Sequence, residues 1–227
     1  MKSNNTIAVV GAGISGLAVA IALRKIGTHV EVFEQAGAFK RVGAAINMTP
    51  NAVKVLDGLG LGKSIRSTAH IPPYRISRIW DTGLETSRVE LGDTAQKRYG
   101  APTLLMHRAD LLTALEGSVP PNFVHMNKKL IRLKNEGNSV ILSFEDGSSF
   151  VADGVIGADG IHSIVREQLF GPEAPIFAGM SAYRSIISVQ LLDGKNLNNF
   201  VKWWGPTPQS QIVMFLINRG MEFFVFA

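Results

Sequence analysis

Three glycines and one carboxylate near the N-terminus have the types and the spacing of a dinucleotide-binding turn. Gly11, Gly13 and Gly16 follow the apolar run 7–10, and Glu34 comes 23 residues after Gly11. In such a turn the first glycine permits a tight bend, the second lets the backbone approach a pyrophosphate, and the third lets helix and strand pack closely. The acid can accept hydrogen bonds from ribose hydroxyls. The pattern therefore predicts binding of the ADP half of a dinucleotide.

The elements that must position these residues are a strand, a helix and a second strand. The apolar run 7–10 and the segment 29–33 predict the strands, and apolar residues at helical spacing between them predict a helix that Gly27 ends. Free N–H groups and the positive end of the helix dipole would face the phosphates. We therefore include Ser15, at the start of this helix, and Gln35, next to Glu34, among the predicted cofactor contacts.

Two further segments carry polar groups that suit a nucleotide. Asp159 and Gly160 follow an apolar strand at 155–158 and precede a helix, and Arg108 stands at the entrance of a short helix at 110–115. A carboxylate can bind a sugar, glycine allows close backbone approach, and a guanidinium suits a phosphate or ribityl oxygen. Each also has a structural alternative, since Asp159 could cap the helix and Arg108 could form a surface salt bridge.

The remaining pattern changes near residue 176. Before it, Thr49 and Pro50 predict a helix start, 70–103 predicts strands and loops, and 140–152 predicts a hairpin. After it, four apolar segments predict an antiparallel sheet: 182–191, 200–204, 211–217 and 221–226. We therefore expect one domain at 1–175 and part of a second at 176–227, to which 70–103 contributes.

Together these segments resemble the single-component FAD-dependent aromatic hydroxylases, the family that contains 4-hydroxybenzoate and salicylate hydroxylases. The resemblance covers essentially all 227 residues. It implies an α/β fold, in which a Rossmann-like FAD-binding domain is joined to an incomplete substrate domain with a mixed, partly antiparallel sheet. It also implies that the glycine turn, Glu34 and Arg108 hold FAD, and that Asp159 and Gly160 serve FAD and NAD(P)H binding.

The same resemblance implies contacts outside the glycine turn. Arg41 and Asn47 would face cofactor or substrate from a flavin-side loop, and the backbone of Leu130 would touch the adenine side. Within the family, residues 201–204 resemble the branch of salicylate hydroxylase and 6-hydroxynicotinate 3-monooxygenase.

The substrate pocket differs from that of the 6-hydroxynicotinate enzyme at three positions. That enzyme has His, Cys and Tyr where this chain has Asn47, Phe200 and Phe215. These three residues and Trp203 are the predicted substrate contacts. The resemblance thus implies a salicylate-like or 6-hydroxynicotinate-like substrate and leaves its identity open.

The activity that the resemblance implies is an NAD(P)H-driven monooxygenase that hydroxylates a small aromatic or N-heteroaromatic hydroxy acid. NADH or NADPH reduces FAD, O₂ forms a flavin C4a-hydroperoxide, and its distal oxygen attacks the ring. No catalytic base is identified, because the histidines are candidates only by residue type: His70, His107, His125 and His162. An NAD(P)-dependent dehydrogenase that uses the same turn is an alternative.

A third possibility is a fragment that binds nucleotide at most and catalyses nothing. The family's downstream Gly-Asp flavin motif is missing, and the chain stops inside the apolar run 223–227. We therefore expect a longer natural protein.

Composition excludes several classes of protein. The chain has no cysteine, which excludes disulfides and thiolate metal ligands, and its five histidines lack metal-ligand spacing. Its net charge of +5 comes from scattered residues, which disfavours nucleic-acid binding. The uncharged stretch 7–23 is short for a membrane span and contains the spaced glycines. We expect a cytoplasmic protein, with the choice of NADH or NADPH and the oligomeric state left open.

Overall fold

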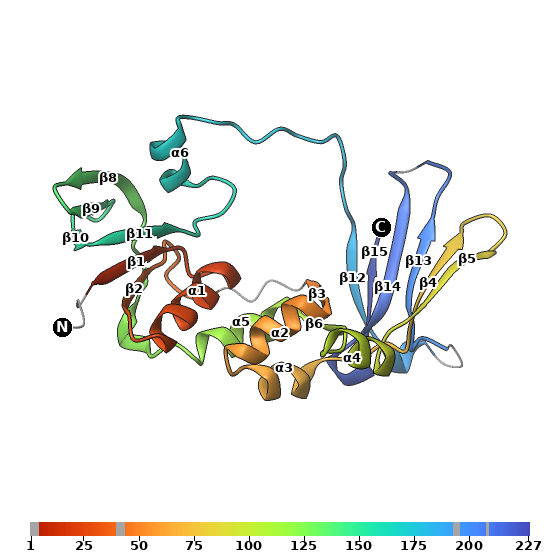
Figure 1. Ribbon diagram of the computed structural model, residues 1–227. Helices are drawn as coiled ribbons and strands as arrows, with labels where there is room; N and C mark the ends of the chain where they lie inside the picture. Colours follow the sequence, from red (N-terminus) through yellow and green to blue (C-terminus); the bar gives the residue numbers. More distant parts are fainter. Residues whose placement is uncertain (1–4, 40–43, 193–195, 208) are drawn as a thin grey trace. The chain divides into compact units, whose positions relative to one another are not determined.

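The computed structural model describes residues 5–39, 44–192, 196–207 and 209–227. It divides into two compact units (Figure 1). Unit 1 comprises residues 1–40 and 112–176, and unit 2 comprises residues 41–111 and 177–227. The chain passes from unit 1 to unit 2 after residue 176, next to the predicted domain boundary at 175. Unit 2 also includes all of 41–111, whereas the prediction assigned only 70–103 of that range to the second domain.

Unit 1 contains a four-stranded parallel sheet in the order β11-β1-β2-β7. Its strands are β1 (Thr6–Val10), β2 (His29–Phe33), β7 (Val124–His125) and β11 (Gly154–Gly157). Helix α1 (Ile14–Lys25) joins β1 to β2 and packs against both. The predicted strand, helix and parallel strand are therefore confirmed, and Gly27 follows the helix with a φ of +86°.

A second sheet of unit 1 is antiparallel, in the order β10-β9-β8. Its strands are β8 (Leu130–Glu136), β9 (Ser139–Phe144) and β10 (Ser149–Ala152), which confirms the predicted hairpin; η1 (Pro121–Phe123) and α6 (Ile164–Phe170) complete the unit. One buried cluster joins residues of both sheets and of α6: Ala8, Val10, Phe33, Leu130, Leu142, Phe144, Ala152 and Val165. The Phe33 ring lies 4.9 Å from the Phe144 ring, so this core fixes the end of β2 against the second sheet.

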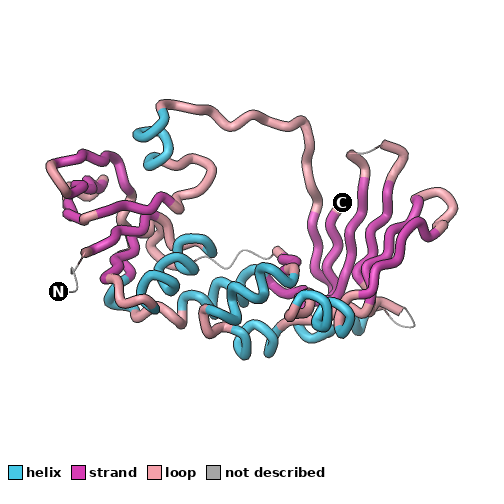
Figure 2. Tube along the Cα trace, in the orientation of Figure 1, coloured by secondary structure: helices cyan, strands magenta, loops and turns pink. Residues whose placement is uncertain are grey.

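Unit 2 contains a six-stranded sheet in the order β12-β15-β14-β13-β4-β5. Its strands are labelled in Figure 1 and drawn in magenta in Figure 2. Its strands are β4 (Tyr74–Ile79), β5 (Glu85–Glu90), β12 (Arg184–Ser188), β13 (Phe200–Trp204), β14 (Gln211–Ile217) and β15 (Glu222–Phe226). A separate two-stranded ladder pairs β3 (Ala45–Met48) with β6 (Leu104–His107). The helical elements are α2 (Pro50–Gly58), α3 (Gly62–Thr68), α4 (Asp93–Tyr99), η2 (Val189–Leu191) and η3 (Asn218–Gly220), and α5 (Arg108–Glu116) runs from unit 2 into unit 1.

The four segments after residue 176 pair antiparallel, as predicted, and the parallel pairing of β13 with β4 makes the whole sheet mixed, as the resemblance implies. The structure corrects two predictions about these elements. Helix α4 lies inside 70–103, where strands and loops were expected, and it ends at Gly100 with a left-handed φ of +80°. The strand expected at 182–191 ends at Ser188 and continues as η2. Among the described residues, no helix has the length and apolar character needed to cross a membrane.

Candidate dinucleotide site

Three parallel strands of unit 1 end at the same level. Val10 at the end of β1 pairs with Phe33 at the end of β2 and with Gly157 at the end of β11. The residues that follow, which include Gly11 and Glu34, therefore share the carboxyl edge of the sheet. Open parallel sheets bind their ligands at this edge.

Two of the three glycines are required by packing within the protein. Gly11 has a φ of +99°, and a Cβ atom there would lie 2.4 Å from the carbonyl oxygen of Ala158. Gly16 is buried, and a Cβ atom there would lie 1.9 Å from the carbonyl oxygen of Gly11. These two glycines therefore let α1, the turn and the loop after β11 approach one another.

Gly13 is different, because space is open around it. It is the N-cap residue of α1, no side chain caps this helix, and no acid lies in its first turn. Among the described residues, no heavy atom would lie within 4 Å of a Cβ atom at Gly13. Within that part of the chain the N–H groups of the first turn, where Ser15 is exposed, therefore lack side-chain acceptors, and the space beside Gly13 is open. Such a helix end suits a phosphate, so these residues fit the pyrophosphate of a dinucleotide.

Glu34 fastens the glycine turn to the segment after β2. Its Oε2 accepts a hydrogen bond of 2.8 Å from the N–H of Ala12, and its Oε1 accepts one of 2.9 Å from the N–H of Ala36. This second function was not predicted from the sequence. A carboxylate has about four acceptor positions, so two remain for ribose hydroxyls.

Replacing Glu34 should therefore weaken the fold as well as nucleotide binding. In Glu34→Ala, the N–H groups of Ala12 and Ala36 lose their acceptor, and we expect the free energy of unfolding to fall by about 1–3 kcal/mol. Urea unfolding followed by circular dichroism measures this change. The control is Gln35→Ala at the exposed neighbouring position, where we expect a change within about 0.5 kcal/mol. Equal stability of the two variants would contradict this function of Glu34.

Asp159 caps helix α6. Its Oδ1 accepts a 2.5 Å hydrogen bond from the Ser163 hydroxyl, and its Oδ2 accepts a 3.2 Å hydrogen bond from the N–H of Val165. The Ser163 hydroxyl in turn accepts from the N–H of Arg166 at 3.0 Å. Of the two alternatives for Asp159, the structure therefore displays the helix cap. Gly160 beside it has a φ of +81° and open space at its Cβ position.

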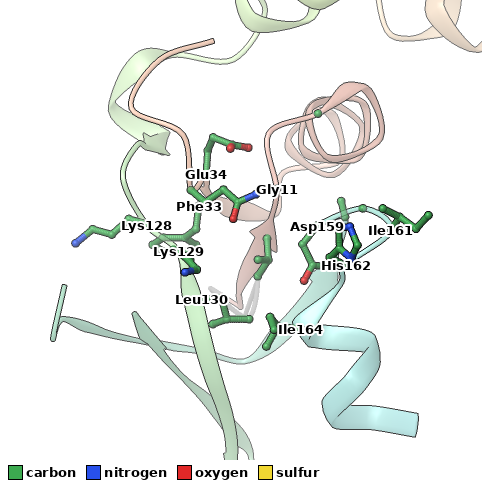
Figure 3. A pocket seen from close by; sticks show the side chains of 15 residues that line it. Gly11, Phe33, Glu34, Lys128, Lys129, Leu130, Asp159, Ile161, His162 and Ile164 are labelled. Carbon is green, nitrogen blue, oxygen red and sulfur yellow. The ribbon is translucent and has the colours of Figure 1, made fainter. Parts of the chain in front are cut away.

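These residues surround one pocket of unit 1, with a volume of about 490 Å³, which is a normal size for a ligand site. It is lined by Val10, Gly11, Gly13, Phe33, Glu34, Gln35, Lys128, Lys129, Leu130, Ala158, Asp159, Gly160, Ile161, His162 and Ile164. Figure 3 shows Glu34 beside the Gly11 turn, with Asp159 and His162 on the loop across from it. The pocket thus brings together seven predicted cofactor residues, while Ser15 and Gly16 of the same unit lie outside its lining.

Neither lysine of the pocket has a free ammonium group. Lys128 donates to Asp146 at 2.5 Å, and Lys129 donates to Glu145 at 2.7 Å. The ammonium of Lys128 and hydrogen bonds from Ser148 hold the pKa of the Asp146 carboxyl well below its usual range. The anion-binding capacity of this pocket therefore comes from backbone N–H groups more than from side-chain charge.

The other predicted contacts belong to unit 2, apart from Arg41, which lies outside the described residues. Arg108 is the first residue of α5 and is half-buried, and within the described residues its guanidinium makes no ion pair. The surface salt bridge considered for Arg108 is thus not seen there. Asn47 and Phe200 line one pocket of unit 2, and the Phe200 ring stacks on that of Phe215 at 5.2 Å.

Trp203 is not part of the lining of that pocket. The centroid of its ring lies 5.9 Å from the guanidinium carbon of Arg78. A Cβ atom built at Gly83 would lie 3.6 Å from the same ring. Its predicted substrate contact therefore stays a prediction.

Three of the four candidate histidines have partners within their own unit. His107 pairs with Glu222 at 2.7 Å, His125 pairs with Glu31 at 2.7 Å, and His70 lies 3.1 Å from the carbonyl oxygen of Asn198. The hydrogen bond from His107 is the main cause that holds the pKa of the Glu222 carboxyl below its usual value. These contacts connect strands and loops, and they identify no catalytic base.

Comparisons with known proteins agree with this geometry. A family model described as an FAD binding domain matches residues 4–220. The 6-hydroxynicotinate 3-monooxygenase of Pseudomonas fluorescens is 39% identical over 206 residues, which cover 90% of this chain and 54% of that protein. The 3-amino-4-hydroxybenzoate 2-monooxygenase of Streptomyces cremeus is 40% identical over 201 residues, which cover 88% of this chain and 51% of that protein.

A solved structure with bound FAD is also similar to this chain. Klebsiella pneumoniae HpxO, complexed with FAD and uric acid, matches with a TM-score of 0.86 and 26% identity over 100% of this chain and 57% of that one. The chain spans about half the length of the curated relatives that it matches. The match over residues 4–220 shows that the chain belongs to the FAD-binding-domain family, which confirms its resemblance to the FAD-dependent aromatic hydroxylases.

Proposed function

We propose that unit 1 binds FAD and that the protein is an NAD(P)H-driven monooxygenase of small aromatic or N-heteroaromatic hydroxy acids. The observation that carries the proposal is the uncapped start of α1 beside Gly13, at the common carboxyl edge of three parallel strands. The helix N-terminus would hold the pyrophosphate, and the remaining acceptor positions of Glu34 would hold the ribose.

Further cofactor contacts follow from the lining of the unit 1 pocket. Gln35 and the backbone of Leu130 would contact the adenosine part, and Gly160 offers an open backbone surface. Arg41 and Arg108, which has no ion pair with any described residue, would serve the phosphate or ribityl oxygens. When bound, FAD supplies the transfer of electrons from NADH or NADPH to O₂.

The reaction class is supported by the names of the relatives. One acts on 6-hydroxynicotinate and another on 3-amino-4-hydroxybenzoate, and each name describes a ring with a hydroxyl group and a carboxylate. We propose the same class of substrate for this protein. One atom of O₂ would enter a ring C–H bond to form a hydroxyl group, the other would leave as water, and NAD(P)H would supply two electrons. A cytoplasmic location is part of the proposal and is supported by the absence of cysteine.

The test separates cofactor binding from turnover. The purified chain is mixed with FAD and desalted, and retained absorbance near 450 nm is the expected result. Oxidation of NADH and of NADPH is then measured with salicylate and with 6-hydroxynicotinate, and hydroxylated product is compared with hydrogen peroxide. Colourless protein would overturn FAD binding. Yellow protein that releases only peroxide would overturn hydroxylation, and substrate-dependent NAD(P)⁺ reduction without flavin would favour the dehydrogenase.

A further inference from the structure

A second pocket lies wholly within unit 2 and has a volume of about 470 Å³. It is formed by β3, the start of α2, β4, β5, α4 and the first residue of β13. Its lining consists of Asn47, Thr49, Pro50, Arg75, Arg88, Val89, Glu90, Leu91, Thr94, Ala95, Arg98, Tyr99, Thr103 and Phe200. Only two of these, Asn47 and Phe200, were predicted as substrate contacts from the sequence.

The lining contains three arginines and one carboxylate. Arg88 is neutralised by Glu85, which accepts from its Nε at 2.6 Å and from its Nη2 at 2.8 Å. Glu90 accepts a 2.6 Å hydrogen bond from the Thr94 hydroxyl. Arg75 and Arg98 make no ion pair with any carboxylate of the described residues. Two guanidinium groups are therefore available to an anion in this pocket.

The positive charge of Arg75 acts on its surroundings. The pKa of the Lys202 ammonium is lowered, first by burial and second by repulsion from Arg75. The Arg98 guanidinium lies over the Tyr99 ring, 5.3 Å from its centroid, which holds the planar group near an apolar surface. An anion beside Arg75 would relieve the repulsion between Arg75 and Lys202.

One wall of the pocket suits an aromatic ring. Phe200 is 9% exposed, and its ring is stacked on the buried Phe215 at an interplanar angle of 11°. Val89 and Leu91 add apolar surface, and the Asn47 side chain brings an amide that can donate and accept hydrogen bonds. Apolar walls combined with a few charged groups are typical of sites for small organic acids.

We propose that this pocket binds the carboxylate of a small aromatic acid through Arg75 and Arg98, with the ring against Phe200 and a ring substituent on the Asn47 amide. A guanidinium offers a carboxylate two parallel hydrogen bonds, a geometry that lysine lacks. The inference deepens the proposed function, because it assigns the residues that select an acid, and it rests on that function for the identity of the acid.

Binding of salicylate to the 227-residue chain, with and without FAD, tests the pocket by equilibrium dialysis. We expect Arg75→Gln and Arg98→Gln each to raise the Kd about tenfold. Lys97→Gln removes the same charge from α4 at an exposed position outside the pocket, and we expect it to leave the Kd unchanged. Salicylamide, which has no carboxylate, should bind weakly and equally to all four proteins. Circular dichroism checks that each variant is folded.

Three outcomes would overturn the proposal. The first is an unchanged Kd in both folded arginine variants. The second is equal affinity for salicylate and salicylamide. The third is displacement of salicylate by equimolar inorganic phosphate, because it would indicate a phosphate site. FAD retention is measured on the same samples. If the chain binds salicylate through the arginines but retains no FAD, only the proposed function is refuted. If it retains FAD but binds salicylate independently of the arginines, only the proposed role of the pocket is refuted.

Discussion

Gly13→Val is expected to reduce FAD affinity at least about 100-fold while the chain stays folded. The backbone of Gly13 has φ −73° and ψ −176°, an extended conformation that valine adopts readily. At its Cβ position the added side chain would have no atom of the described ranges within 4 Å. It would instead occupy the space into which the first-turn N–H groups of α1 open, and so would keep the pyrophosphate away. The cost to stability should stay below about 1 kcal/mol, the scale of an N-cap exchange.

Two measurements on the same variant check this expectation. A fluorescence titration with FAD gives the affinity, and thermal unfolding gives the stability. Gly58→Val is the matched control, because position 58, at the end of α2 in unit 2, also offers a Cβ atom open space. We expect the control to retain FAD. Wild-type FAD affinity in Gly13→Val would remove the observation on which the proposed function rests.

The βαβ portion of the fold could be predicted because its signals are local. The helix between β1 and β2 is short, and the glycine spacing fixes where the turn must be tight. What Glu34 contacts could not be predicted in the same way. Its carboxylate binds the N–H of Ala12, 22 positions earlier, and that contact exists only once β1 and β2 are aligned. The sequence likewise allowed Asp159 either of two functions, and the position of the Ser163 hydroxyl decides which one is seen.

Unit 2 could be predicted less completely because its decisive contacts are between distant segments. Strand β13 pairs in parallel with β4, although more than a hundred residues separate Ile79 from Phe200. Antiparallel pairing of neighbouring strands is the simpler expectation, and it holds for β13, β14 and β15. The unit 2 pocket that contains Arg75 and Arg98 could not be predicted for the same reason. Arg75 and Arg98 come from β4 and from a helix that the sequence pattern did not indicate, so no motif connects them.

Gly16→Ala is expected to cost far more stability than any substitution at Gly13, although it adds a single carbon atom. That atom would lie 1.9 Å from the carbonyl oxygen of Gly11 and 3.3 Å from the Cβ atom of Ala158. The close neighbour is backbone, so α1 must move away from β1 and from the loop after β11 to relieve the overlap. Overpacking of this kind costs about 1–3 kcal/mol or more, and here it displaces a helix that packs against two strands of the sheet.

Gly13→Ala provides the matched control, because it adds the same atom to the same helix end in open space. Alanine is a poorer N-cap than glycine, but it also lowers the conformational entropy of the unfolded chain, so we expect the stability of Gly13→Ala to change by less than about 1 kcal/mol. Urea unfolding of the two variants should therefore separate them by about 1–3 kcal/mol or more, with Gly16→Ala the less stable. Equal unfolding free energies would mean that α1 can shift freely relative to β1. The tight turn would then not be what positions the helix N-terminus, and the pyrophosphate site inferred from it would lose its structural cause.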